Sequence, residues 1–160
     1  MELSSPNVGR SFIAPEPLLT ILVTGDPAPK GSKKAFVVKG RAIITDVSHK
    51  GSRDRLGAWE LAVTAAVQRA LERKIGWSPL DEPLLVVVTF WLARPAGAPK
   101  RVVAPAKKPD LDKLARALLD VCTKTVWVDD ARIVELRLEK RFAQRTPGAR
   151  IEVARAGETY

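Results

Sequence analysis

The spacing of apolar residues divides the chain into two segments of helical periodicity and several shorter segments that are typical of β-strands. From about residue 54 to residue 74, apolar side chains recur at helical spacing, which predicts an amphipathic helix packed on a flat surface. Residues 111–121 show the same periodicity, with apolar residues on one face and charged residues on the other. The pattern therefore predicts two main helices.

The remaining apolar segments have the length and the β-branched composition of strands. Residues 84–92 are almost continuously apolar, which is typical of a buried strand. Residues 133–142 alternate, so we expect a strand with one wet face and with Val134, Leu136, Leu138 and Phe142 on its buried face. Further strands are expected at residues 18–24, 36–38, 42–44 and 150–154, the second and third forming a hairpin.

These elements predict an α+β fold in a single domain, with a small mixed β-sheet and two main helices. Residues 1–17 contain three prolines and no periodicity, so we expect a flexible N-terminal arm there. The folded domain is expected to span residues 18–155, followed by a C-terminal tail at residues 156–160. No internal repeat or linker divides this domain.

The charge of the chain points to an anionic partner. There are 27 Lys and Arg residues against 18 Asp and Glu, a net charge of +9. Nucleic acid is the leading partner class, and an anionic membrane surface is the competing one. No apolar segment approaches the roughly 20 residues needed to span a bilayer, and a single cysteine, Cys122, fits a reducing compartment. We therefore expect a soluble, cytoplasmic protein that does not act in a membrane.

Two aspartates directly follow a pair of lysines. Lys107 and Lys108 are followed by Pro109, Asp110 and, two residues later, Asp112. The proline disfavours helical backbone at the residue before it, so the second helix should begin close to Asp110. Lysines attract phosphate and carboxylates bind divalent cations, a combination that suits cleavage of a nucleic-acid backbone.

A second acidic pair, Asp129 and Asp130, is the natural further contributor, because two-metal cleavage needs several carboxylate oxygens around Mg²⁺. Trp127, just before this pair, is expected to fill the core and to set the position of the pair. A simpler interpretation stays open: an aspartate at a helix start is most often an N-cap, and an adjacent acidic pair is most often a solvated turn. A restriction-type nuclease is disfavoured. It would need Glu-x-Lys or Asp-x-Lys on a following strand, where this chain has Glu-Leu-Arg at 135–137 and Glu-Lys-Arg at 139–141.

The acidic segments resemble a known family. Residues 108–120 read KPDLDKLARALLD and residues 126–134 read VWVDDARIV, which is similar to the core motif of the RusA family of Holliday-junction resolvases. Upstream, a strand, the segment GDPAPKGS at 25–32, a hairpin and a long helix agree with it, so the resemblance spans roughly residues 18–153. It implies a small homodimer that uses Mg²⁺, or Mn²⁺, to nick two opposed strands of a four-way DNA junction.

The resemblance also implies roles for individual residues. Asp110, Asp112 and Asp130 would be the essential metal-binding carboxylates, with Asp129 a further candidate. The family has a functionally important lysine four residues beyond the second aspartate, where this chain has Arg116. Arginine can hold a phosphate through two hydrogen bonds but cannot readily donate a proton. We assign Arg116 to phosphate or transition-state stabilisation, with a salt bridge to Asp112 as the alternative.

Two basic stretches contain no acidic residue, residues 30–41 and residues 94–108. Charge runs are usually solvated surfaces, but the second one leads directly into the carboxylates, which favours contact with DNA. Lys113 replaces an asparagine that is common in the family and is a candidate for phosphate contact. The DNA-binding candidates are Lys30, Lys33, Lys34, Lys107, Lys108 and Lys113.

The sequence thus predicts a Mg²⁺-dependent, homodimeric endodeoxyribonuclease that resolves four-way junctions and needs no small-molecule cofactor. Two alternatives remain. A non-catalytic protein could bind branched or duplex DNA through the basic stretches alone, and a metal-dependent nuclease could act on flaps or other branched DNA. A dimer is expected because resolution needs two cuts related by two-fold symmetry.

Overall fold

A computed structural model of the chain describes residues 15–31, 33–46 and 50–157, without the side chains of residues 33–36, 38 and 43–46. Four strands form the main sheet in the order β1–β6–β4–β5. Their bounds are β1 Leu19–Thr24, β4 Leu84–Leu92, β5 Ile133–Phe142 and β6 Gly148–Arg155. β6 is antiparallel to both of its neighbours, and β5 is parallel to β4, so the sheet is mixed, as predicted.

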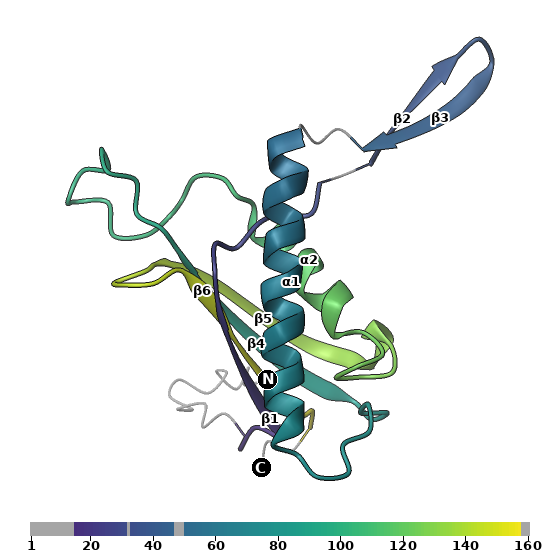
Figure 1. The fold of residues 1–160 in the computed structure, drawn as a ribbon, viewed down its shortest axis with the longest axis vertical. Coiled ribbons are helices and arrows are strands. Elements are labelled where there is room, and N and C mark those ends of the chain that lie inside the picture. Colours follow the sequence, from purple (N-terminus) through teal and green to yellow (C-terminus); the bar gives the residue numbers. More distant parts are fainter. Residues whose placement is uncertain (1–14, 32, 47–49, 158–160) are drawn as a thin grey trace, which may run out of the picture.

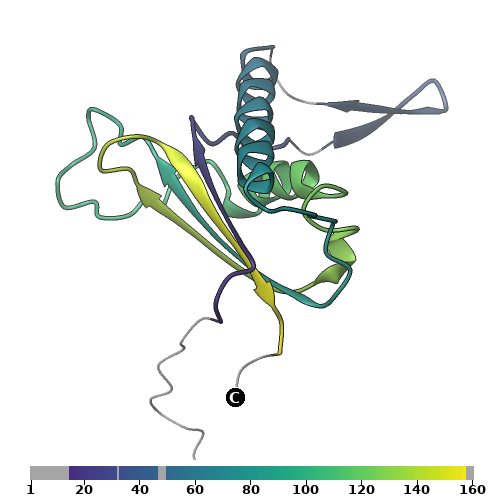
Figure 2. The ribbon, with the colours of Figure 1, turned by 60° about the horizontal axis from the view of Figure 1, so that its bottom comes forward.

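Two helices, α1 (Lys50–Glu72) and α2 (Leu111–Cys122), lie side by side over the same face of this sheet (Figures 1 and 2). Both predicted helices are confirmed, although α1 begins a turn before the predicted start. The apolar stripe of each helix supplies the core together with the inward residues of the strands. The α+β architecture expected from the sequence is therefore confirmed. In the described part of the chain, neither helix is long and apolar enough to cross a bilayer.

β1 shows how the sheet separates its two faces. Leu19, Ile21 and Val23 are buried, whereas the residues that alternate with them are exposed. Successive side chains of a strand point to opposite faces, so the first set packs beneath the helices and the second set lies on the uncovered face. β1 is also an edge strand, because its only ladder is with β6 among the described residues.

The hairpin predicted near residues 36–44 is confirmed, as strands β2 (Lys33–Val38) and β3 (Arg41–Asp46). The turn between them, Lys39 and Gly40, has positive φ angles of 49° and 74°, a conformation that glycine adopts at little cost. The hairpin is a separate two-stranded sheet that extends away from the main body (Figures 1 and 2).

The predicted burial of β5 is wrong at two positions. Val134 is 63% exposed and Leu136 is 40% exposed, although both were expected to be buried. β5 is an edge strand, and the 12 residues of α2 are too few to cover its whole length. Leu138 packs against the core, and it also lines an open pocket beside α2 together with Leu136. The exposure of this strand is therefore set by the reach of the helix above it.

The basic segment at residues 93–110 connects β4 to α2 and contains no helix or strand, as predicted. Arg94 anchors its start, because its Nη2 donates a hydrogen bond to the Pro99 carbonyl at 2.8 Å. The guanidinium of Arg94 also lies 4.9 Å from the centre of the Phe142 ring, a cation–π contact with the end of β5.

Candidate metal and DNA-binding site

The outward face of α2 carries a line of charged residues. Leu114 and Leu118 are buried, so Asp112, Arg116 and Asp120, spaced four residues apart, lie on the solvent-exposed side of the helix. At 1.5 Å of rise per residue, this line is about 12 Å long. It offers two carboxylates with a guanidinium between them.

These three residues line a shallow pocket of about 260 Å³ beside β5. Asp130 lines the same pocket, and its floor is apolar, formed by Ala115, Leu119, Leu136 and Leu138. The structure therefore brings together three of the residues singled out from the sequence, Asp112, Arg116 and Asp130. They come from two separate elements, because Asp130 begins the short 3-10 helix η1 (Asp130–Arg132) that precedes β5.

Asp130 is held in place by two hydrogen bonds to the same carboxylate oxygen. The indole Nε1 of Trp127 donates to Oδ1 at 2.7 Å, and the Thr123 hydroxyl lies 2.6 Å from the same oxygen. Trp127 is fully buried, so one of these donors is fixed by the core. Among the described residues, Oδ2 of Asp130 accepts no hydrogen bond, which leaves that oxygen available to a cation. The sequence-based expectation that Trp127 positions the acidic pair is confirmed for Asp130.

Asp110 lies at the start of α2 and outside the pocket lining. Its side chain makes no capping hydrogen bond and instead forms an ion pair with Lys113, with Oδ2 and Nζ 3.0 Å apart. The hydrogen bond and the charge of Lys113, followed by the charges of Lys108 and Lys140, lower the pKa of Asp110 below its usual value. Asp110 therefore stays ionised in mildly acidic solution and could exchange its lysine partner for a metal ion.

Asp129 has a structural contact. Its Oδ1 accepts a hydrogen bond from the backbone N–H of Ala131 at 2.8 Å, which caps η1. Asp129 does not line the pocket. Asp129 therefore fits the simpler interpretation of the acidic pair, a residue of a solvated turn, whereas Asp130 lines the pocket.

Arg116 is exposed, and among the ion pairs of the described residues none joins it to Asp112. The salt bridge considered from the sequence is therefore absent in this part of the chain. The guanidinium of Arg116 lies at the pocket without a carboxylate partner among those residues, in a position to meet a phosphate.

Lys30 reaches the same helix from the loop after β1. Its Nζ lies 2.5 Å from Oδ2 of Asp120, and its backbone N–H donates to the Lys113 carbonyl at 3.0 Å. Sequence reasoning assigned no role to Asp120. The signal was its spacing of four residues from Arg116 and eight from Asp112, which places it on the same helix face.

Lys140 is a second residue that the sequence reasoning missed. Its Nζ donates to the carbonyls of Lys107 and Pro109, at 2.8 and 2.9 Å, which fastens the segment that leads into Asp110 against β5. The sequence did contain a signal for such a contact: strand alternation places Lys140 on the same face as Leu138, which was predicted to be buried. Lys107 and Lys108 are themselves exposed beside this contact. Lys33 and Lys34 open β2, and their side chains lie outside the described part of the chain.

The donor set suits a hard divalent cation. Carboxylate oxygens are the ligands that Mg²⁺ and Mn²⁺ prefer, and Mg²⁺ usually takes only one or two protein carboxylates, the remainder being water and substrate phosphate. Asp112 and Oδ2 of Asp130 have no hydrogen-bond partner among the described residues, so both could serve. No group of three or more metal-ligating side chains converges in that part of the chain, so the pocket would hold a cation with help from substrate.

An exposed carboxylate pocket with an adjacent guanidinium, in a protein of net charge +9, is typical of an enzyme that acts on nucleic-acid phosphates. A comparison with protein families supports that class, because the family model described as "Endodeoxyribonuclease RusA" matches residues 26–154. The chain belongs to the RusA family of endodeoxyribonucleases. A comparison with curated proteins found no match.

Proposed function

We propose that this protein is a Mg²⁺-dependent endodeoxyribonuclease that resolves four-way DNA junctions by paired nicks. The observation that carries the proposal is the common pocket of Asp112, Arg116 and Asp130 in a chain of the RusA family. The family supports an activity on DNA, and the pocket supplies groups that such an activity needs. Mn²⁺ has the same preference for carboxylate oxygens and is expected to substitute for Mg²⁺.

Asp112 and Asp130 would hold the cation, and Asp110 would join them once it leaves Lys113. When bound, the ion would activate water for attack at phosphorus and neutralise charge on the departing oxygen. Trp127 and Thr123 keep Oδ1 of Asp130 occupied and thereby present Oδ2 to the pocket. Asp129 is a less suitable ligand, because its carboxylate caps η1.

Positive side chains around this pocket would hold the DNA. Arg116 can make two parallel hydrogen bonds to the phosphate being cleaved and stabilise the negative charge that develops on it. Lys113 pairs with Asp110 in this structure. If Asp110 bound the metal instead, Lys113 would be released and could contact phosphate. We propose that Lys30, Lys33, Lys34, Lys107 and Lys108 make further contacts with the phosphate backbone of the DNA.

A homodimer follows from the proposed reaction. Resolution of a four-way junction needs two cuts related by a two-fold axis, and an isologous dimer supplies that axis. Each subunit would cut one strand.

The proposal is tested with a panel of end-labelled DNA: a four-way junction, a flap and a linear duplex, each with Mg²⁺, Mn²⁺ or EDTA. We expect symmetric nicks in the junction with either metal, none in EDTA, and little cleavage of the duplex. A preference for the flap would favour a metal nuclease of other branched DNA. Tight binding of the junction without any cleavage would favour the non-catalytic alternative.

A further inference from the structure

We propose that a groove between α1 and β1 binds the phosphate backbone of a DNA arm, as a second DNA-contact surface separate from the carboxylate pocket. This inference rests on the proposed function, because it assumes that branched DNA is the substrate. The groove has a volume of about 580 Å³ and lies at the β1 edge of the sheet, whereas the carboxylate pocket lies beside β5 at the other edge.

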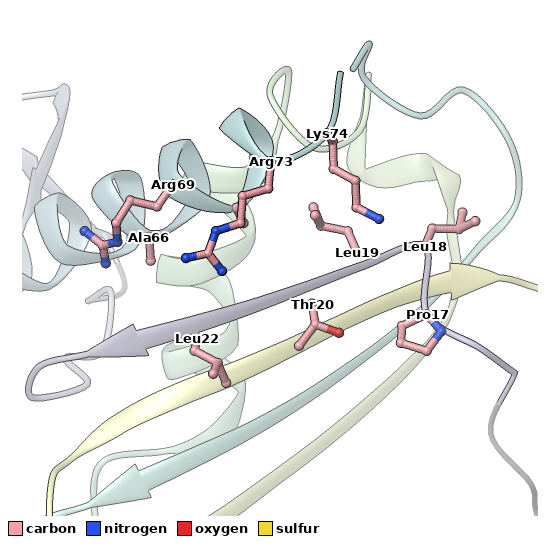
Figure 3. A pocket seen from close by; sticks show the side chains of 10 residues that line it. Pro17, Leu18, Leu19, Thr20, Leu22, Ala66, Arg69, Arg73 and Lys74 are labelled. Carbon is pink, nitrogen blue, oxygen red and sulfur yellow. The ribbon is translucent and has the colours of Figure 1, made fainter. Parts of the chain in front are cut away.

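Three basic residues form one wall of this groove. Arg69 extends from the last turn of α1, and Arg73 and Lys74 extend from the turn that follows the helix, on the side of β1 (Figure 3). The rest of the lining is mainly apolar, formed by Pro17, Leu18, Leu19, Leu22, Ala66 and Ala70, together with Thr20. Thr20 and Leu22 lie on the uncovered face of β1, so the groove passes around the β1 edge of the sheet. A hollow with cations on one side suits a chain of phosphates that passes along the surface.

The positive charge of the groove is not neutralised by the described residues. None of their carboxylates lines it, and Glu16 and Glu72, which are near its residues in sequence, lie outside the lining. In the described part of the chain, the side chains of Arg69, Arg73 and Lys74 make no hydrogen bond or ion pair. By contrast, the arginines of β5 and β6 are paired with carboxylates, as Arg150 is with Glu152 at 2.7 Å. Three adjacent unpaired cations favour an external anion.

Neither helix-dipole stabilisation nor a protein partner accounts for this arrangement as well as DNA does. Cations in the last turn of a helix stabilise its dipole, but only by roughly 0.3–1 kcal/mol, and that effect needs neither a groove nor a cluster. A second copy of this chain is a poor occupant because it also carries a charge of +9. Many of its acidic side chains are already paired with cations, Glu82 with Arg155 among them. DNA phosphate provides the complementary charge, and arginine can hold it through two hydrogen bonds.

The test compares two double variants of the full chain, Arg69→Gln/Arg73→Gln and Arg53→Gln/Arg55→Gln. Each removes two exposed arginines from α1 or the turn that follows it, but only the first pair lines the groove. Affinity for a four-way junction is measured in EDTA between about 50 and 200 mM salt. Each phosphate contact adds about 0.9 to the slope of log affinity against log salt. We therefore expect the groove variant to lose about 1.8 from that slope and the control variant to lose less than half as much.

Equal slopes in the two variants, or an unchanged slope in the groove variant, would overturn the inference while leaving the proposed function intact. Light scattering provides a second criterion. If the groove variant were monomeric where the wild type is dimeric, the groove would hold a second copy and not DNA. A wild-type protein that binds no branched DNA would instead contradict the proposed function, and the groove proposal with it.

Discussion

At the residue scale, the site depends on how Asp130 is oriented. Its Oδ1 is occupied by Trp127 and by Thr123, so the carboxylate presents its other oxygen to the pocket shared with Asp112. Outer contacts of this kind fix the orientation of metal ligands, and their loss typically costs 10-fold to 100-fold in metal affinity or activity. The contact with Thr123 is the better one to test, because its removal leaves the buried Trp127 in place.

Replacing Thr123 with valine removes the hydroxyl next to Asp130 and keeps the size of the side chain. We expect the Mg²⁺ concentration for half-maximal cleavage to rise about tenfold, because Asp130 loses one of its two positioning contacts. The matched control is Thr125→Val, since that hydroxyl bonds only to backbone carbonyls, those of Val121 and Cys122. Equal Mg²⁺ requirements in the two variants would contradict a positioning role for Thr123.

Cys122 provides a prediction about pH. Burial, followed by the nearby negative charge of Asp130, raises the pKa of this thiol from 9.0 to about 12. The folded protein therefore keeps the thiol protonated at pH 8, and we expect a thiol-specific reagent to label it only after denaturation, as the thiolate is the reactive form. Rapid labelling of Cys122 in the native protein would contradict the burial of this thiol.

The same shift predicts how stability depends on pH. The unfolded chain loses this proton from about pH 9 upward while the folded chain keeps it, so stability should fall between pH 9 and 12.

At the scale of elements, local periodicity was sufficient to locate both helices and the bounds of β4, because each has a long and regular apolar pattern. It also placed Asp112 and Arg116 on one helix face. It could not predict that Val134 would be exposed, since that depends on how far α2 extends over β5. Nor could it predict the Lys30–Asp120 pair, which joins residues 90 positions apart.

Gly148 offers a test of the packing between β1 and β6. A Cβ atom at this position would lie 2.1 Å from the Val23 carbonyl oxygen, a backbone atom that cannot move without shifting β1. We expect Gly148→Ala to lower the free energy of unfolding by about 3 kcal/mol, measured by chemical denaturation. Gly97→Ala is the control, because nothing lies within 4 Å of a Cβ placed there. Similar stabilities of the two variants would show that the strands are not packed this closely.

At the scale of the whole molecule, three aspartates gather at one edge of the sheet. The protein is basic overall, at +9, yet Asp112, Asp120 and Asp130 share one pocket at the β5 edge of the sheet. The basic groove lies at the β1 edge, and the hairpin extends beyond the body. This arrangement predicts that binding and cleavage are separable, because in the proposed function the basic surfaces would supply DNA affinity and the carboxylates would hold the metal needed for cleavage.

The most direct measurement is therefore cleavage of a four-way junction by wild type, Asp112→Asn and Asp130→Asn, with Asp54→Asn as a control carboxylate on the exposed surface of α1. Bound metal contributes several kcal/mol to phosphodiester cleavage. The two pocket variants should accordingly lose about 10³-fold or more in rate, while their affinity for the junction in EDTA stays at least as high as that of the wild type. Asp54→Asn should cut normally. Normal cleavage by both pocket variants would contradict the assignment of this pocket as the catalytic metal site.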